Sequence, residues 1–177
     1  MLTPILIATA AIIVALLVVI ASRLDEFRVT RTATIPAPPA AVFAQVNDLH
    51  DWEGWSPWAK LDPNAKSVFE GPSAGTGAVM RWIGNKKVGE GSMTIIESRP
   101  NELVRFKLEF LKPFKATNTA EFTFKPEENQ TVVTWSMFGK NNFMGKAFGL
   151  IMNCDKMVGS QFEKGFANLR SVVASKN

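Results

Sequence analysis

The N-terminal segment Met1–Ser22 constrains this chain most, because no charged side chain interrupts its run of Ile, Leu, Val and Ala. A helix rises about 1.5 Å per residue and the hydrocarbon core of a bilayer is about 30 Å thick, so residues 2–21 are about long enough to span it once. A cleaved secretory signal is the competing interpretation, but signals place a basic residue before a shorter apolar run, and none precedes this one. We therefore predict a transmembrane anchor over residues 1–22 and one soluble domain over residues 23–177.

The basic residues beside the anchor predict its orientation. Arg23, Arg28 and Arg31 all follow the apolar run, and Lys or Arg close to a span tend to remain in the cytoplasm. We expect a single-pass membrane protein whose soluble domain faces the cytoplasm. Cleavage near Ala21 would instead release much the same domain into an export compartment.

Composition narrows the class of protein. About 155 residues follow the anchor, enough for one domain with a sizeable core. The net charge of +4 is spread along the chain, which favours a surface near anionic headgroups over nucleic-acid binding.

A single cysteine, Cys154, and a single histidine, His50, exclude an internal disulfide and any multi-cysteine metal site. No P-loop or HExxH motif occurs, and Gly75-Thr76-Gly77 precedes a strand, so we expect no metal and no cofactor.

Periodicity predicts the order of the elements. Alternation over residues 27–35 predicts a half-buried strand, which a proline run stops. Helical spacing over residues 40–46 predicts a short helix, and Trp52, Trp55 and Trp58 predict a second short helix or turn. Six runs with period two then predict an antiparallel meander. These runs are 68–70, 78–83, 92–97, 103–111, 117–125 and 131–138.

The last segment, residues 142–173, has an apolar stripe at helical spacing and predicts a long amphipathic helix. Its glycines predict a break or kink over residues 149–155, or a thinned flank, and both can hold. We therefore predict an α+β fold in which a curved antiparallel sheet wraps around the long C-terminal helix. Two short helices follow its first strand. Long, flexible methionines on the inner face favour a cavity between the two layers.

Several motifs follow one another along the chain: Thr34-Ile35-Pro36-Ala37-Pro38-Pro39 with Val42-Phe43, then Val46-Asn47-Asp48, Trp52, Trp55-Ser56-Pro57-Trp58, Gly75-Thr76-Gly77 and Glu97-Ser98-Arg99-Pro100. This order resembles the START-like helix-grip superfamily, also called SRPBCC, in its polyketide cyclase/dehydrase-like branch. The resemblance covers about residues 27–174. It implies a cavity for lipids, sterols, polyketides or other apolar molecules, and only some members of the superfamily catalyse a reaction.

Candidate ligand-binding residues come from the inner face of the sheet and the stripe of the last helix. They are Met80, Trp82, Met93, Phe106, Phe122, Trp135, Met137, Phe148, Ile151 and Asp155. Asp155 falls within the apolar stripe, where burial would raise its pKa and suit it to act as a general acid or ligand anchor. The alternatives are that its carboxylate turns outward, or that it pairs with Lys156 or Arg81. Glu97 alternates with Met93 and is the second catalytic candidate; its alternative is an ion pair with Arg99.

These features support three hypotheses. The first is a membrane-anchored binding protein for a small hydrophobic or amphipathic ligand, such as a lipid, isoprenoid or polyketide-like molecule. The second is a cyclase, dehydratase or hydrolase that uses Asp155 and Glu97, and we favour it less than the first. The third is a tethered interaction module with a filled core and an exposed edge at Trp52, Trp55 and Trp58. Nothing in the sequence identifies a protein partner, and we expect no nucleic-acid partner.

Overall fold

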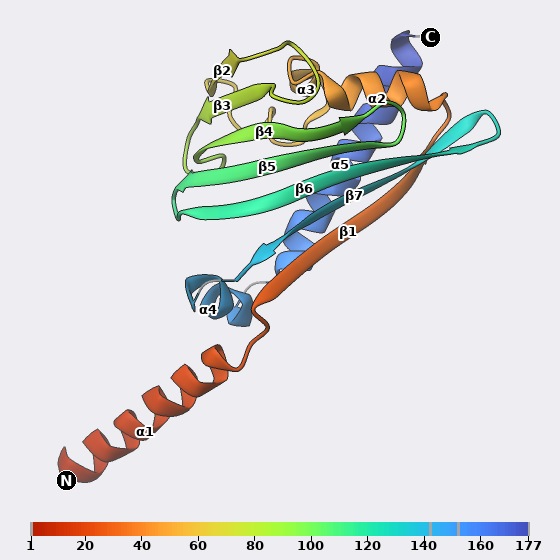
Figure 1. Ribbon diagram of the computed structural model, residues 1–177. Helices are drawn as coiled ribbons and strands as arrows, with labels where there is room; N and C mark the ends of the chain where they lie inside the picture. The colour runs from red at the N-terminus through yellow and green to blue at the C-terminus, as the bar shows by residue number, and fades with distance from the viewer. Residues whose placement is uncertain (1, 142, 152, 177) are drawn as a thin grey trace.

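A seven-stranded antiparallel sheet and a long C-terminal helix form the two main layers of the domain (Figure 1). The structure, a computed structural model, describes residues 2–141, 143–151 and 153–176, with the backbone alone at Leu2, Met144, Phe148 and Ile151. The elements are α1 (Leu2–Ala21), β1 (Glu26–Ile35), α2 (Pro39–Asn47), α3 (Trp52–Trp55), β2 (Lys66–Glu70), β3 (Val79–Ile83), β4 (Glu90–Arg99), β5 (Leu103–Lys112), β6 (Ala116–Glu127), β7 (Gln130–Lys140), α4 (Phe143–Ile151) and α5 (Cys154–Lys176).

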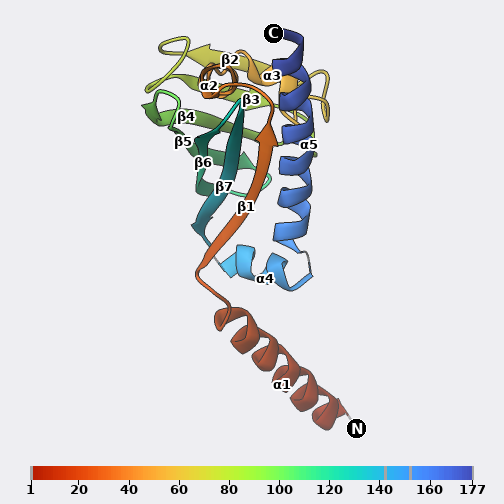
Figure 2. The same cartoon turned by 90° about the vertical axis from the view of Figure 1, so that its right-hand side faces the viewer.

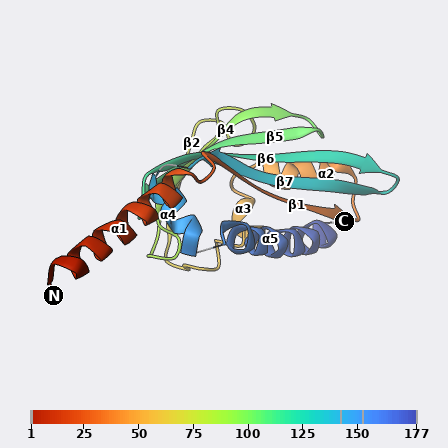
Figure 3. The same ribbon diagram turned by 90° about the horizontal axis from the view of Figure 1, so that it is seen from below.

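The strand order is β1-β7-β6-β5-β4-β3-β2, so β2 to β7 are joined by consecutive hairpins and β1 closes the sheet beside β7. This confirms the predicted meander. Alternation places Val29 and Ile35 of β1 inside, while Thr30 and Thr32 face outward. Seen from below, α5 runs along one side of the arched sheet (Figure 3).

The two short helices cover one end of the core. Proline near the start of α2 presets the helical φ at a position with no hydrogen bond to lose, and Val42 and Val46 are buried. The indole N–H groups of Trp52 and Trp55 donate to the carbonyl oxygens of Val46 (2.9 Å) and Gln45 (3.0 Å). Both indoles are buried. The hypothesis of an interaction edge built from exposed tryptophans is therefore wrong for these two residues.

The predicted C-terminal helix is two helices, because the chain leaves the helical path between α4 and α5. This confirms the predicted break and corrects the single helix over residues 142–173. Short α4 lies beside the junction with α1 (Figures 1 and 2). There Lys146 Nζ donates to the carbonyl oxygen of Ala21 (3.3 Å) and pairs with Asp25 Oδ1 (2.5 Å).

Helix α1 stands away from the domain in both side views (Figures 1 and 2). Residues Thr3–Ala21 are long and apolar enough to cross a membrane, with a mean hydropathy of 3.0. Its side chains are exposed along nearly the whole length, and Ile20, next to the domain, is buried. No other described part of this chain covers the helix, and this exposed apolar surface is the feature on which the membrane proposal below depends.

Candidate ligand cavity

A cavity of about 350 Å³ lies between the sheet, the segment around α3, and α5. This volume is at the lower end of the range for ligand pockets, about 300–1,000 Å³. Apolar side chains supply most of its wall: Trp52, Trp58, Ala59, Ala65, Met80, Trp82, Val88, Met93, Leu108, Phe110, Pro113, Ala120, Trp135, Met137 and Phe162. The remaining lining residues are Glu53, Ser56, Ser67, Lys86, Lys87, Gly89 and Lys112.

Five of the sequence-predicted ligand-binding residues line this cavity, namely Met80, Trp82, Met93, Trp135 and Met137. Alternation along β3, β4 and β7 places them on the concave face. Thioether side chains adapt their shape easily, so a wall with three of them suits an apolar ligand of irregular outline.

Phe106 and Phe122 do not line the cavity, although they lie on the same face of the sheet. Both are fully buried and pack edge-on against Trp52, with ring centroids 5.3 and 5.9 Å from its indole. The α3 segment fills the space above them, which a strand pattern alone does not reveal. The side chains of Phe148 and Ile151 lie outside the part of the chain that the structure describes.

Trp135 forms the floor of the cavity beside α5. Its indole stacks on Phe162, with centroids 4.0 Å apart and planes inclined by 11°, and a tilted contact of 4.5 Å joins it to Phe122. Its Nε1 is buried and has no hydrogen-bond partner among the described residues. The ring also lies against Gly165, where an added Cβ would approach Trp135 Cζ3 to 2.7 Å. A glycine of the last helix thus makes room for this indole.

The turn between β3 and β4 supplies the part of the wall that sequence reasoning missed. Lys86, Lys87 and Val88 line the cavity from this turn. Asp62 holds it in place, because its carboxylate accepts the backbone N–H of Asn85 (2.6 Å) and that of Asn64 (3.1 Å). The signal available in the sequence was a basic, glycine-bounded turn, Gly84 to Gly89.

Charge gathers on one part of the cavity lining. Lys86 and Lys87 make no ion pair among the described residues, whereas Lys112 Nζ lies 2.7 Å from Glu90 Oε2. Glu53 is the single carboxylate among the residues that line the cavity. The wall is therefore apolar with a basic rim, an arrangement that suits an apolar or amphipathic molecule.

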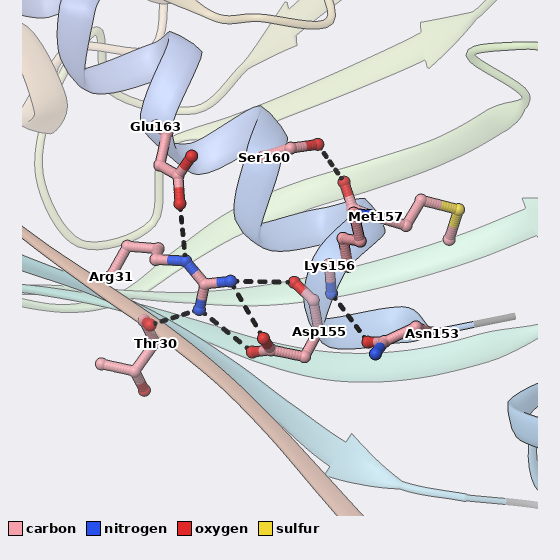
Figure 4. A network of polar contacts seen from close by, with 8 residues as sticks. All are labelled: Thr30, Arg31, Asn153, Asp155, Lys156, Met157, Ser160 and Glu163. Carbon is pink, nitrogen blue, oxygen red and sulfur yellow. Dashed lines mark hydrogen bonds and ion pairs between the residues drawn. The ribbon is translucent and has the colours of Figure 1, made fainter.

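The interpretation of Asp155 as a buried carboxyl with a raised pKa is wrong, and the alternative that its carboxylate turns outward is confirmed. Its side chain is 59% exposed, and Arg31 of β1 binds it in a bidentate manner: Nη1 lies 3.0 Å from Oδ1 and Nη2 lies 3.0 Å from Oδ2 (Figure 4). Hydrogen bonding to Arg31 holds the pKa of Asp155 below its ordinary value. The partner is neither Lys156 nor Arg81, and Asp155 does not line the cavity.

Glu97 lies on the outer face of the sheet. A register shift between Ile95 and Glu97 makes Ile96 an extra residue, so Glu97 pairs across the ladder with Arg105 instead of following Ile95 inward. Its carboxylate contacts Arg105 and lies 3.2 Å from Arg99 Nε. The alternative interpretation, an ion pair with Arg99, is confirmed. Neither catalytic candidate is in contact with the cavity.

The lone His50 and Cys154 lie in separate surroundings. His50 stacks on Phe69, with centroids 4.1 Å apart, and its Nδ1 lies 2.9 Å from Asp48 Oδ1. Burial, with the nearby Asp155 charge, raises the pKa of the Cys154 thiol. Among the residues that the structure describes, no three His, Cys, Asp or Glu side chains group closely enough to hold a metal ion.

An arched sheet that encloses a hollow against a C-terminal helix defines the chain as a helix-grip protein. Residues 26–174 match the family described as "Polyketide cyclase / dehydrase and lipid transport", and the chain belongs to this family. No curated protein sequence matches it significantly.

Solved structures share the fold at low sequence identity. CV1439 from Chromobacterium violaceum is 14% identical with a TM-score of 0.59, and the match covers 84% of this chain and 96% of that one. Ms6760 from Mycobacterium smegmatis is 16% identical with a TM-score of 0.61, over 88% and 96%. TTHA0849 from Thermus thermophilus is 20% identical with a TM-score of 0.59, over 85% and 99%. At these identities the likeness establishes the fold alone.

Proposed function

We propose that this protein is a membrane-anchored binding protein for a small hydrophobic or amphipathic molecule, held in the cavity between the sheet and α5. The observation that carries the proposal is the apolar cavity of about 350 Å³. Its methionine and aromatic wall recognises shape and apolar surface rather than a fixed pattern of hydrogen bonds. The family description, which includes lipid transport, supports the same class of ligand.

Anchoring by α1 makes physical sense for such a ligand. A lipid, isoprenoid or polyketide-like molecule partitions into the bilayer, so a receptor tethered there meets it at a high local concentration. A free receptor would depend on rare monomers in water. Arg23, Arg28 and Arg31 follow the span, which favours a domain on the cytoplasmic side.

The geometry gives no support to a reaction driven by cavity carboxylates. Asp155 and Glu97 are both engaged by arginines away from the cavity. Glu53 alone does not provide the acid and base pair that such a reaction needs.

The test uses the full chain in lipid nanodiscs and a fluorescent fatty acid analogue as the probe. We expect saturable binding with one probe per chain, energy transfer from the cavity tryptophans to the probe, and displacement by unlabelled apolar molecules. Native mass spectrometry of the chain extracted from membranes in mild detergent should show a co-purified small molecule. Absence of both a retained molecule and saturable probe binding would overturn the proposal.

A further inference from the structure

The cavity lysines lie at the end of the sheet where the chain arrives from α1. The register pairs Glu26, the first residue of β1, with Lys140, the last residue of β7. In the antiparallel order, the β5–β6 and β3–β4 turns fall at this same end. In Figure 1 the β5–β6 turn lies at the left of the sheet, and α1 runs away to the lower left. We call residues 84–89 and 112–115 the open end.

Charge distinguishes the open end from the opposite end of the sheet. Lys86, Lys87 and Lys115 lie in the turns of the open end, and those turns contain no acidic residue. At the opposite end, the turns between β4 and β5 and between β6 and β7 carry Glu102 and Glu128 and no basic residue. The turns are therefore basic at the end of the sheet on the side of the anchor, and this excess of lysine is missing from the turns at the opposite end, where Arg99 of β4 pairs with Glu102.

Apolar side chains accompany the basic ones. Phe114, between Pro113 and Lys115, is 51% exposed, and Leu111, three residues earlier in β5, is 48% exposed. Ile83, where β3 enters the other turn, is 60% exposed. Exposed aromatic and aliphatic side chains beside lysines are the combination that inserts shallowly among anionic headgroups.

We propose that the open end docks on an anionic phospholipid surface, the surface of the bilayer that holds α1. This inference rests on the proposed anchoring of the chain. Docking turns the basic rim of the cavity toward the headgroups, so an amphipathic ligand moves between bilayer and cavity without crossing bulk water. The segment between α1 and β1, residues 22–25, contains no helix or strand and connects the anchor directly to this end of the sheet.

The experiment measures the depth of single side chains in vesicles that carry the full chain. A nitroxide is attached at Phe114→Cys, or at Asn129→Cys in the opposite turn, both in a Cys154→Ser background. Vesicles contain phosphatidylcholine alone or an equal mixture with phosphatidylglycerol. We expect the label at position 114 to lose most of its access to a water-soluble nickel relaxant in the anionic vesicles, whereas the label at position 129 keeps full access in both.

Charge reversal supplies the matched variants. Lys86→Glu with Lys115→Glu should return the label at position 114 to water in anionic vesicles. Lys125→Glu with Lys164→Glu makes the same change in net charge at exposed sites outside the open end and should leave the label protected. Full nickel access at position 114 in anionic vesicles that have retained the chain would overturn docking alone. Failure of the chain to float with vesicles of either composition would instead overturn the anchor.

Discussion

Arg31 of β1 and Asp155 of α5 join the first strand of the sheet to the last helix across a sequence separation of 124 residues. The guanidinium also donates from Nε to Glu163 Oε1 (3.0 Å) and from Nη1 to the carbonyl oxygen of Thr30 (2.8 Å) (Figure 4). It lies directly over Gly159, where a Cβ would collide with Nη2. Because Gly159 has no side chain, the planar guanidinium of Arg31 can lie against α5 and bind Asp155, Glu163 and the carbonyl oxygen of Thr30 together.

Replacing Asp155 by Asn should change how stability depends on pH. Arg31 lowers the pKa of Asp155 in the folded protein, so the folded state binds fewer protons than the unfolded chain. The stabilisation is fully present above the ordinary value of 3.8 and is lost as the pH falls through the lower folded pKa. We expect Asp155→Asn to be slightly less stable than the wild type at neutral pH and equal to it in strong acid. Thermal unfolding across this pH range measures the difference.

Glu128 provides the control for that experiment, since its carboxylate lies in the β6–β7 turn and makes no ion pair among the described residues. Glu128→Gln should leave the acid profile unchanged. Parallel profiles for the wild type and Asp155→Asn would mean that the pair contributes nothing in solution, as many exposed ion pairs do.

Both Arg31 and Asp155 interrupt an apolar pattern in the sequence, but the sequence analysis singled out only Asp155. Asp155 interrupts the apolar stripe of the last helix, and Arg31 interrupts the apolar alternation of the first strand between Val29 and Ala33. When two apolar faces that pack together each carry one charge, and the charges are opposite, an ion pair between them is expected. The partners considered for Asp155 were Lys156 on its own helix and Arg81 on β3. They did not include a residue of β1, the strand that packs against α5.

Gly165→Ala should destabilise the protein by about 1–3 kcal/mol, the usual effect of overpacking. The added methyl group would approach Trp135 Cζ3 to 2.7 Å, and the ring could move away from it only by giving up its contacts with Phe122 and Phe162. Gly149→Ala in α4 is the matched control, because a Cβ there meets nothing within 4 Å. It should stabilise the helix by up to about 1 kcal/mol. Denaturant unfolding measures the free energy of unfolding of both variants. Equal changes in the two would show that the Trp135 ring can move to accommodate the methyl group.

Cys154 should react slowly with alkylating reagents. Burial is the main cause of its raised pKa, and the negative charge of Asp155 adds to it, so little reactive thiolate is present near neutral pH. Asp155→Asn removes the second cause and should increase the rate with iodoacetamide, while Glu163→Gln, farther along α5 from this contact, should not. Rates followed by intact mass across alkaline pH report the shift. An unchanged rate in Asp155→Asn would leave burial as the sole cause.

The strands and their concave face follow from alternation, but two features of the site do not. The register shift after Ile95 reverses the face on which Glu97 lies, and one extra residue leaves no periodic signal. The α3 segment and the β3–β4 turn close over the sheet, so they decide which inner residues line a cavity and which pack. Phe106 and Met93 share a face of the sheet, yet only Met93 lines the cavity.

Ala120→Leu should weaken binding of the fluorescent fatty acid analogue by about tenfold or more, equivalent to about 1.4 kcal/mol. Ala120 is a small residue in the wall, between Phe106 and Met137 in neighbouring strands, and a leucine there projects into the cavity. Thr119→Leu makes a similar enlargement one residue earlier, on the outer face of β6, and should bind the probe as the wild type does. Ser67→Leu also narrows the cavity, and its position is partly exposed. It replaces Ala120→Leu in the experiment if that variant does not fold. Because the three variants differ in whether their side chain enters the cavity, equal affinities in all of them would place the probe elsewhere on the protein.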